Sequence, residues 1–562
     1  TMTYGDQSDT RIKWLRVDGE LNFDEDADSK LVVDTFIVDY DGTLEIGTEN
    51  NPITGSVDIV IADNGDIDTA WDTLLQSRGL IAHGVTRIHG QEKTVHGMVS
   101  SDPMAGDSSI TMAETPDNWQ VGDVIVVAGT YYRGYHGWEP AVGYTPPQDE
   151  IRTITNISGR TVSFADPLSH DPDTPRADLK TSVANYTRNV TVRSENGENA
   201  EIRHRGHVMF MHNDDVDVRY AAFWHLGRTN KAVPSLEAVE FDTMTPGTNV
   251  RGRYSLHIHR TGADDLAKDP VIAMGNAVFG SPGWGYVHHD SYAIFHNNAS
   301  YDTFGAGYVA ETGNEIGAWT NNIAIYAKGQ SWKDPKLGND TVNFDLAQTG
   351  DGFWFQGRMV SSINNIAASV NNGFVYFHRG GTGEGRMIQF TSESSPIGGA
   401  FWHDKDVFPD QHPILGFWKN ESFATNKGLY ILKASPVQGH DVHTTLEDFT
   451  AWSIKNGVDI SYTGHYVLKS FDLIGGKNTN LGSAETGIKV DFNSMNLIFI
   501  ESIIEGFDTG INLVKGFAPH IGGTIEDHDF TILDPTFINV ENHYENYDPT
   551  VDTIAPDIDI PY

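Results

Sequence analysis

The 562-residue chain has no cysteine, no long apolar run and few basic residues. The absence of cysteine excludes a disulfide framework and thiolate metal ligands. No stretch approaches the ~18 consecutive apolar residues of a membrane helix, so no membrane span is expected. Lysine and arginine together number 38 against 77 aspartates and glutamates, which gives a formal net charge of −39. Because phosphate binding needs a basic surface, this charge argues against a nucleic-acid partner.

A surface this acidic suits a soluble protein in a salty or calcium-rich medium, where its charge is screened. It counts against a polyanionic substrate unless a local basic patch or bound cations intervene. The start of the chain shows no secretory signal, which a mature exported chain would have lost. The acidic surface favours a secreted, extracellular protein, as does the family resemblance described below. An insertion at residues 401–413, with His403, Asp404 and Asp406, either binds calcium or lines a cleft.

Glycine is abundant, with 57 residues, and it separates short β-like runs that lack a helical period. From about residue 186 onward, glycines followed by an apolar residue recur at intervals of 22, 45, 21, 55, 29, 30 and 23 residues. Asn-Asn steps accompany them at Asn297, Asn321 and Asn364, where stacked asparagines can satisfy turn amides. Repeats of this length predict a parallel β-helix. The glycines concerned are Gly285, Gly307, Gly352, Gly373, Gly428, Gly457, Gly487 and Gly510.

The composition changes along the chain and predicts four parts. Residues 1–30 are a polar lead-in, and residues 31–100 form a glycine-rich β domain of short alternating strands. Residues 101–545 are expected to form the β-helix with loop insertions. Residues 546–562 are an acidic tail that contains proline.

Histidines concentrate in residues 251–315. In a strand, residues i and i+2 point to the same face, so His257 and His259 project side by side. His288 and His289 follow about one coil later, so that the two runs can become neighbours. These four histidines predict a site for a divalent metal, zinc or another first-row ion, because nitrogen ligands without sulfur suit such ions. The alternative is a stacked histidine ladder with a structural role.

Acidic and basic residues near these histidines are candidates for catalysis. Glycoside hydrolysis needs two carboxylates, for which Asp290, Asp302, Glu311 and Glu315 are candidates. A polysaccharide lyase would instead need a base and a cation that neutralises a uronate carboxylate. Arg253 is a candidate for this catalytic role and Arg260 for substrate binding. A carboxylate of this kind is more often a solvated turn residue than a catalyst.

Aromatic residues predict a sugar-binding cleft, since their rings combine an apolar body with a polar rim. Tyr135 and Trp138 lie in a long aromatic loop, and Trp284 and Trp319 lie beside glycine turns. We name these four as candidate substrate-binding residues. The alternatives are a lid over the core for the loop and core filling at coil corners for the tryptophans.

The run RGRYSLHIHRTG at residues 251–262 resembles the RYPIHFH motif of the family of the cell-migration-inducing hyaluronan-binding protein and the cell-surface hyaluronidase. The resemblance extends to GTLEIGTENNP at residues 42–52 and GLIAHGVTRIHG at residues 79–90, in that family's eight-glycine domain. It implies an all-β chain, a right-handed parallel β-helix preceded by a small glycine-rich β domain. It also implies action on hyaluronan or another polysaccharide. This chain departs from the family at Ser255 and Ala306, and it lacks the family's cysteines.

Together these observations predict a secreted enzyme that degrades a polysaccharide by hydrolysis, with metal assistance. The alternatives are a lyase that acts on a uronate-containing polymer and a non-catalytic, calcium-stabilised carbohydrate-binding or adhesion module. The oligomeric state cannot be inferred from the sequence.

Overall fold

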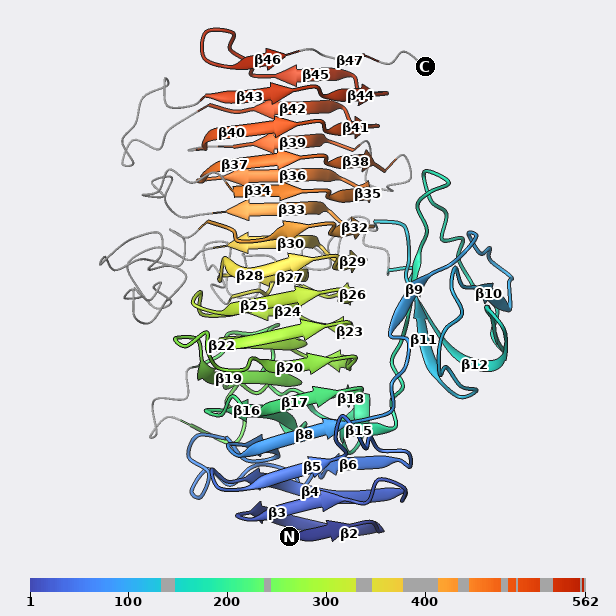
Figure 1. The fold of residues 1–562 in the computed structure, drawn as a ribbon, viewed down its shortest axis with the longest axis vertical. Helices are drawn as coiled ribbons and strands as arrows, with labels where there is room; N and C mark the ends of the chain where they lie inside the picture. Colours follow the sequence, from blue (N-terminus) through green and yellow to red (C-terminus); the bar gives the residue numbers. More distant parts are fainter. Residues whose placement is uncertain are drawn as a thin grey trace.

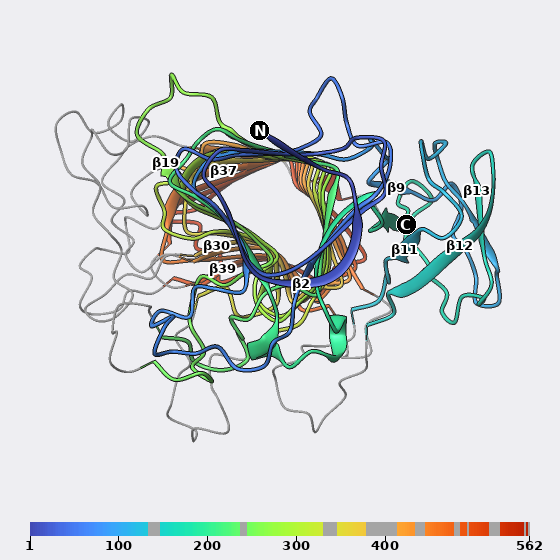
Figure 2. The same cartoon turned by 90° about the horizontal axis from the view of Figure 1, so that it is seen from below.

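In the computed structural model, the described part of the chain comprises residues 1–132, 147–236, 244–329, 346–377, 413–432, 444–476, 484–491, 494–515, 529–555 and 558–559. Its regular structure is almost entirely β-strand, and 41 strands join in one coiled sheet with parallel pairing between coils. The coils form a tall stack (Figure 1) and surround a common axis when seen from one end (Figure 2). The predicted parallel β-helix is confirmed. Among the described residues, no helix has the length and apolar character that a membrane crossing requires.

Each complete coil contributes strands to three faces, and β2 (Gln7–Val17), β4 (Ser29–Val38) and β22 (Tyr286–His296) each bend across two of them. Face 1 contains β1 (Met2–Tyr4), β3 (Glu20–Phe23), β5 (Thr43–Ile46), β8 (Val85–His89), β17 (Val216–Arg219), β20 (Val271–Met274), β25 (Ile316–Thr320), β28 (Met359–Ile363), β31 (Phe417–Trp418), β34 (Thr444–Glu447), β37 (Gly464–Lys469), β40 (Met495–Ile500), β43 (Phe530–Leu533) and β46 (Thr553–Ala555). Face 2 contains β6 (Val57–Ile61), β15 (Val190–Ser194), β18 (Ala221–Trp224), β21 (Ala277–Ser281), β23 (Ala299–Thr303), β26 (Ile323–Ala327), β29 (Ile366–Ala368), β32 (Glu421–Phe423), β35 (Thr450–Ile454), β38 (Asp472–Gly475), β41 (Ile503–Glu505), β44 (Thr536–Ile538) and β47 (Ile558–Asp559). Face 3 contains β7 (Gly79–Ala82), β16 (His207–Met211), β19 (Leu256–Gly262), β24 (Ala306–Ala310), β27 (Asp351–Phe355), β30 (Asn372–Phe377), β33 (Lys427–Leu432), β36 (Asn456–Ser461), β39 (Thr486–Val490), β42 (Thr509–Leu513) and β45 (Asn542–Glu545).

The glycine-apolar repeat of the sequence sets the register of face 3. The apolar residues that follow the eight glycines stand directly opposite one another, from Tyr286 and Tyr308 to Ile488 and Ile511. Four of them are aromatic, and their rings stack inside the tube at 4.6, 4.7 and 4.9 Å. A side chain at Gly457 would come within 2.3 Å of the next coil's carbonyl, which explains the glycine beside each column residue.

The expected asparagine stack is confirmed at the corner between faces 1 and 2. Asn276, Asn298, Asn322, Asn365 and Asn420 are buried, and their side-chain oxygens accept a backbone N–H from the preceding coil or corner at 2.9–3.0 Å. Because buried backbone amides need partners, this ladder stabilises successive corners.

The structure divides the N-terminal region differently from the sequence prediction. Residues 1–30, expected as a polar lead-in, contain β1, β2 and the paired strand β3, which are coils of the same solenoid. Strands β4–β8, expected as a separate glycine-rich domain, continue this stack and pair with β15, β16 and β17. One hydrophobic core runs from Val17 to Phe537. In the tail, expected to be outside the β-helix, β46 and β47 add to faces 1 and 2.

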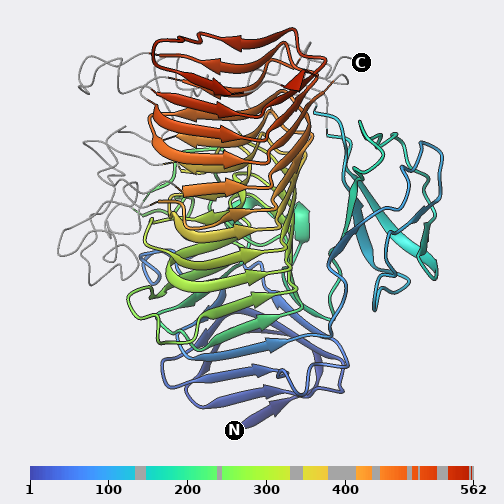
Figure 3. The same cartoon turned by 45° about the horizontal axis from the view of Figure 1, so that its top comes forward.

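A six-stranded antiparallel module interrupts the solenoid between β8 and β15. It consists of β9 (His96–Met98), β10 (Ser109–Thr111), β11 (Val124–Val127), β12 (Glu150–Ser158), β13 (Thr161–Phe164) and β14 (Ser182–Asn185). The sequence prediction had placed β-helix coils here. The module stands beside the stack (Figure 3) and packs through Val126, Ala184 and Tyr186 on outward residues of face 2. Two short 3-10 turns, Gly197–Asn199 and Ile202–His204, follow β15.

Candidate metal centre on face 3

The outward side of face 3 carries the histidine cluster. In β19, His257 and His259 point outward while Ile258 belongs to the buried core. The next coil pairs Ile258 with His288 and His259 with His289. His289 therefore lies on the same side as His259, whereas His288 continues the inward column of Ile258.

The histidine triad, His257, His259 and His289, brings three ring nitrogens together. Nδ1 of His259 lies 3.2 Å from Nε2 of His257 and 3.2 Å from Nδ1 of His289. All three nitrogens lie within 4.8 Å of one another. Zinc–nitrogen bonds in tetrahedral sites require nitrogens about 3.3 Å apart, so the two short separations fit such an ion.

Protons alone do not satisfy both short nitrogen–nitrogen contacts of the triad. Nδ1 of His257 faces the Gly252 carbonyl oxygen at 3.0 Å, so this nitrogen donates and Nε2 presents a lone pair to His259. If neutral His259 carries its proton on Nδ1 to meet that lone pair, it cannot also accept a bond from His289. If it accepts from His289, two lone pairs face each other at 3.2 Å. A cation between the nitrogens removes this conflict, so the residues fit a metal ion.

A glycine turn orients His257. Gly252 has φ +87°, a conformation that side-chain-bearing residues rarely adopt, and its carbonyl accepts the His257 ring N–H. Such a bond from the far nitrogen fixes the tautomer and the ring orientation of a metal-binding histidine.

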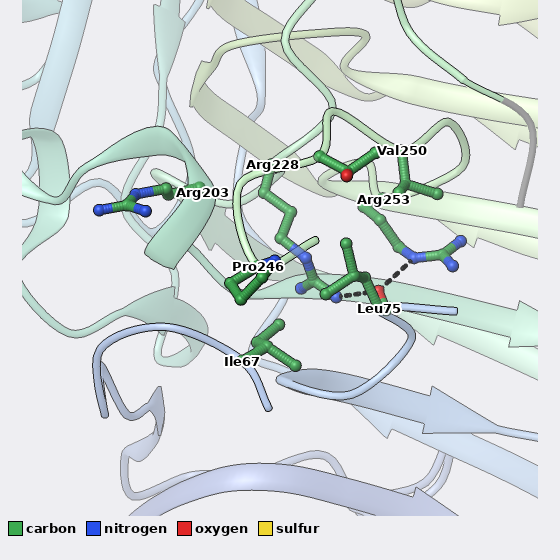
Figure 4. Close-up of a pocket in the computed structure, with 8 residues that line it drawn as sticks. Ile67, Leu75, Arg203, Arg228, Pro246, Val250 and Arg253 are labelled. Atoms are coloured by element: carbon green, nitrogen blue, oxygen red, sulfur yellow. Dashed lines mark hydrogen bonds between the residues drawn. The ribbon is translucent and has the colours of Figure 1, made fainter. Parts of the chain in front are cut away.

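The neighbouring Arg253 holds this turn and does not reach the triad. Its guanidinium donates to the carbonyls of Leu75 (2.9 Å), Leu74 (2.8 Å) and Arg251 (3.1 Å), and it is buried. Arg228 approaches the same Leu75 carbonyl at 2.6 Å from the other side (Figure 4). Burial lowers the pKa of Arg253 to about 10, which still leaves it charged at neutral pH. Arg253, a predicted catalytic residue, instead ties the Gly252 turn to the loop before β7.

Glu311 is the predicted carboxylate that reaches the triad. It follows β24, and its Oε2 lies 3.1 Å from Nδ1 of His289. Burial opposes ionisation of Glu311, but the adjacent His289 outweighs it and lowers the pKa of Glu311 to about 2. The same pairing raises the pKa of His289 against the effect of burial. Without a metal, this ion pair therefore stabilises the charged forms of both side chains.

Glu315 and Asp290 shape the turns beside the triad. Glu315 is buried and accepts the backbone N–H groups of Asp290 (3.0 Å), Thr312 (2.7 Å) and Gly313 (2.7 Å). It thus joins the turn after His289 to the turn after Glu311. Asp290 has φ 48° and accepts a short hydrogen bond from the Asn314 amide. Both carboxylates make positioning contacts in the described structure, and their predicted catalytic role stays a prediction.

Two other predicted site residues lie inside the tube. His288 is buried beside Phe295 and bonds the Ser291 carbonyl through Nε2 at 2.7 Å, and burial lowers its pKa to about 4. Trp319, a predicted sugar-binding residue, is fully buried against Phe295 and Phe355. Both face inward because the strand alternation puts them there, so His288 cannot complete the triad and Trp319 cannot meet a sugar.

The remaining candidates lie around the triad or outside the described residues. Trp284 is buried in an outer cluster, with Tyr254 stacked at 4.5 Å and the Lys231 ammonium 3.7 Å above its ring. Arg260 is exposed at the corner after His259. Tyr135, Trp138 and the 401–412 part of the acidic insertion lie outside the described residues.

Three features of this site were missed from the sequence. Lys231 stands near Glu311, whose pKa it helps to lower, although the prediction did not select it. The Gly252 carbonyl and the loop at Leu74 and Leu75 were missed as well. The position of Gly252, five residues before the His-x-His strand, is a signal that could have indicated the role of its carbonyl. No local signal indicates the loop at Leu75, which lies 178 residues before Arg253.

Comparison with known families identifies two segments. Residues 1–98 match the model of the G8 domain, and residues 203–401 match the model of the CEMIP β-helix. A G8 domain-containing protein of Dictyostelium discoideum is 24% identical over 369 residues, covering 62% of this chain and 29% of that protein. Fibrocystin-L of Homo sapiens is 24% identical over 405 residues, covering 66% of this chain and 9% of its own length. Fibrocystin-L of Mus musculus is 23% identical over 521 residues, covering 86% of this chain and 11% of its own length. The chain thus spans less than a third of each of these relatives.

Solved structures with a similar course of the chain include the catalytic domain of GH87 α-1,3-glucanase in complex with nigerose. It is 11% identical, with a TM-score of 0.35 over 82% of this chain and 89% of that one. The tailspike gp61 of Pseudomonas phage phi297 is also 11% identical, with a TM-score of 0.25; the match covers 93% of this chain and 71% of the tailspike chain.

Proposed function

Because this chain belongs to the family that joins a G8 domain to a CEMIP-type parallel β-helix, we propose that it is a polysaccharide-degrading enzyme whose active centre holds a divalent metal on the histidine triad. The observation that carries the proposal is the convergence of three imidazole nitrogens, two pairs of them 3.2 Å apart, with a carboxylate beside them. Zinc or another first-row ion suits this donor set. Export to the cell exterior belongs to the same proposal.

Each residue of the centre has a distinct task. When bound, the metal supplies Lewis acidity toward a water molecule or a substrate oxygen. Glu311, 3.1 Å from His289, is the group that accepts a proton at Oε2. Gly252 and Arg253 orient His257 through its ring N–H. Glu315 keeps Glu311 beside His289 by fixing both turns.

The geometry favours metal assistance over a pair of catalytic carboxylates. Of the four predicted carboxylates, Glu311 stands at the triad. Glu315 is engaged by three backbone amides, Asp290 by Asn314 and Asp302 by Lys328. Hydrolysis is the leading reaction. Elimination from a uronate is the second candidate, because the exposed Arg260 beside the triad could neutralise the uronate carboxylate.

Metal analysis of the purified chain, combined with a reducing-end assay over a panel of polysaccharides that includes hyaluronan, tests the proposal. We expect about one metal ion per chain, loss of activity on chelation and recovery when the ion is returned. An unsaturated uronate product, detected by its ultraviolet absorbance, would assign elimination instead of hydrolysis. A chain that binds no metal and cleaves no polymer contradicts the proposal and favours the non-catalytic carbohydrate-binding module.

A further inference from the structure

A column of rings leads away from the histidine triad toward the N-terminal coils. Tyr40, His83 and His212, which we call the ring column, come from three successive coils at the corner between faces 3 and 1. Ring centroids are 4.6 Å apart between Tyr40 and His83, and 5.5 Å apart between His83 and His212. His212 lies 6.1 Å from His259 of the triad. The rings therefore continue, one per coil, into the candidate metal centre.

The ring column is open to solvent, unlike the aromatic stacks within the tube. Tyr40 is 61% exposed, His212 is exposed and His83 is half-buried. By contrast, Tyr286 and Tyr308 are fully buried in the interior stack. Exposed rings add little to the core, so burial does not account for this column.

The column offers two kinds of sugar contact. Neighbouring planes are tilted by 33° and 35°, so the rings partly cover one another. The exposed His212 ring and the Tyr40 hydroxyl, 3.4 Å from Nδ1 of His212, can bond sugar hydroxyls. Tyr40 ends the column, and its high exposure leaves ring surface on which a pyranose can stack.

Resting on the proposed function, we infer that the ring column is a set of substrate subsites on which a polysaccharide chain runs along the solenoid axis. Coils are spaced about 4.8 Å apart, which is close to the length of one pyranose unit in a chain. Three coil steps separate Tyr40 from His259, about 14 Å along the axis. Because the Tyr40 ring lies over His83 and its hydroxyl reaches His212, Tyr40 contacts a sugar about two to three units from the bond that is broken, and only longer chains reach it.

Affinity gel electrophoresis of the chelated chain, in gels that contain either long-chain hyaluronan or a neutral β-glucan, tests this inference without turnover. We expect Tyr40→Ala to weaken retardation by the polymer that binds about five- to tenfold, the range of a lost ring contact. Tyr40→Phe keeps most of this binding, since it keeps the ring. His212→Ala weakens it as well. Added disaccharide should compete equally weakly against the wild type and Tyr40→Ala.

Trp418→Ala is the matched control, because Trp418 is an exposed ring, 43% accessible, on face 1 far along the stack. Metal content and unfolding temperature are measured for every variant. Unchanged retardation of both Tyr40→Ala and His212→Ala would show that the ring column does not bind the polysaccharide, while the proposed metal enzyme would remain supported. The inference is also wrong if neither polymer retards the wild type. A wild-type chain that binds no metal and has no activity would instead count against the proposed function.

Discussion

The two surfaces of face 3 differ sharply although the same strands build both. Inside the tube, His288 lies in one column with Ile258 and Ala310 and next to Phe295. Outside, His289 lies one residue further on, beside His259 and Glu311. One residue of chain therefore separates an imidazole committed to packing from one whose nitrogen faces two other nitrogens and a carboxylate.

This difference shows how a β-helix can hold a reactive site without weakening its core. Strand alternation separates the two surfaces completely, so ligands on the outside need no polar partner inside. The core row beside the triad remains free of charged groups, with Leu256, Tyr286 and Tyr308 all fully buried. We expect inward substitutions to change stability and outward ones to change metal binding and turnover.

The largest expected effects, on metal binding and on stability, come from replacing His288 and His289 by alanine one at a time. His289→Ala removes one of three nitrogens and should abolish metal binding and activity, with the unfolding temperature nearly unchanged. His288→Ala leaves a cavity in the tube and should cost about 2–5 kcal/mol, while the folded chain keeps its metal. Metal content and thermal unfolding are measured on both variants. If His288→Ala loses the metal and His289→Ala retains it, the assignment of the two surfaces is wrong.

Much of this arrangement follows from the sequence. The glycine-apolar repeat predicted the parallel β-helix, and the structure explains the repeat, because a glycine is required wherever the next coil's backbone approaches closely. The His-x-His spacing predicted that His257 and His259 share a surface. It could not choose between His288 and His289, since that choice depends on the register between β19 and β22 rather than on local pattern.

Other features have no local signal. The strands of residues 96–185 alternate as solenoid strands do, so the antiparallel pairing of the inserted module was not predicted. Asp290 and Glu315 resemble catalytic carboxylates in the sequence, and only the folded turns show that they bind Asn314 and backbone amides. Arg253 bonds a loop 178 residues earlier, a contact that spacing cannot show.

Arg253 sharpens the comparison, because it lies outside the tube but does not touch the triad. Arg253→Met keeps much of the side-chain bulk and removes the bonds to Leu74 and Leu75. The Gly252 carbonyl then loses its support, and His257 its fixed orientation. Loss of such a supporting contact typically weakens metal binding about 10- to 100-fold, which competition with a chromophoric chelator measures. Arg253→Lys should recover part of the affinity. A lowered unfolding temperature with unchanged metal affinity would show that the clamp serves stability alone.

The smallest expected effect concerns the place where the outside of the solenoid is covered by the antiparallel module. Asp149 accepts bonds from the Gly129 N–H (2.7 Å) and from the Ser369 hydroxyl of the solenoid (2.8 Å), and its buried Oδ2 has no hydrogen-bond partner among the described residues. Burial raises the pKa of Asp149 to about 7. The unfolded carboxyl titrates near pH ~3.9, so between these values the native state holds a proton that the unfolded state has lost.

Stability should therefore fall as pH rises through this window and stay low above it. Asp149→Asn removes the titration, so its unfolding temperature should exceed that of the wild type by a few degrees at pH 8 and match it near pH 4. Ser369→Ala should steepen the wild-type decline, since the ionised carboxylate loses a donor. Thermal unfolding across this pH range measures all three chains. Parallel curves for the wild type and Asp149→Asn would mean that the carboxyl is already ionised without cost, and that the module covers this part of the solenoid less tightly than its hydrogen bonds indicate.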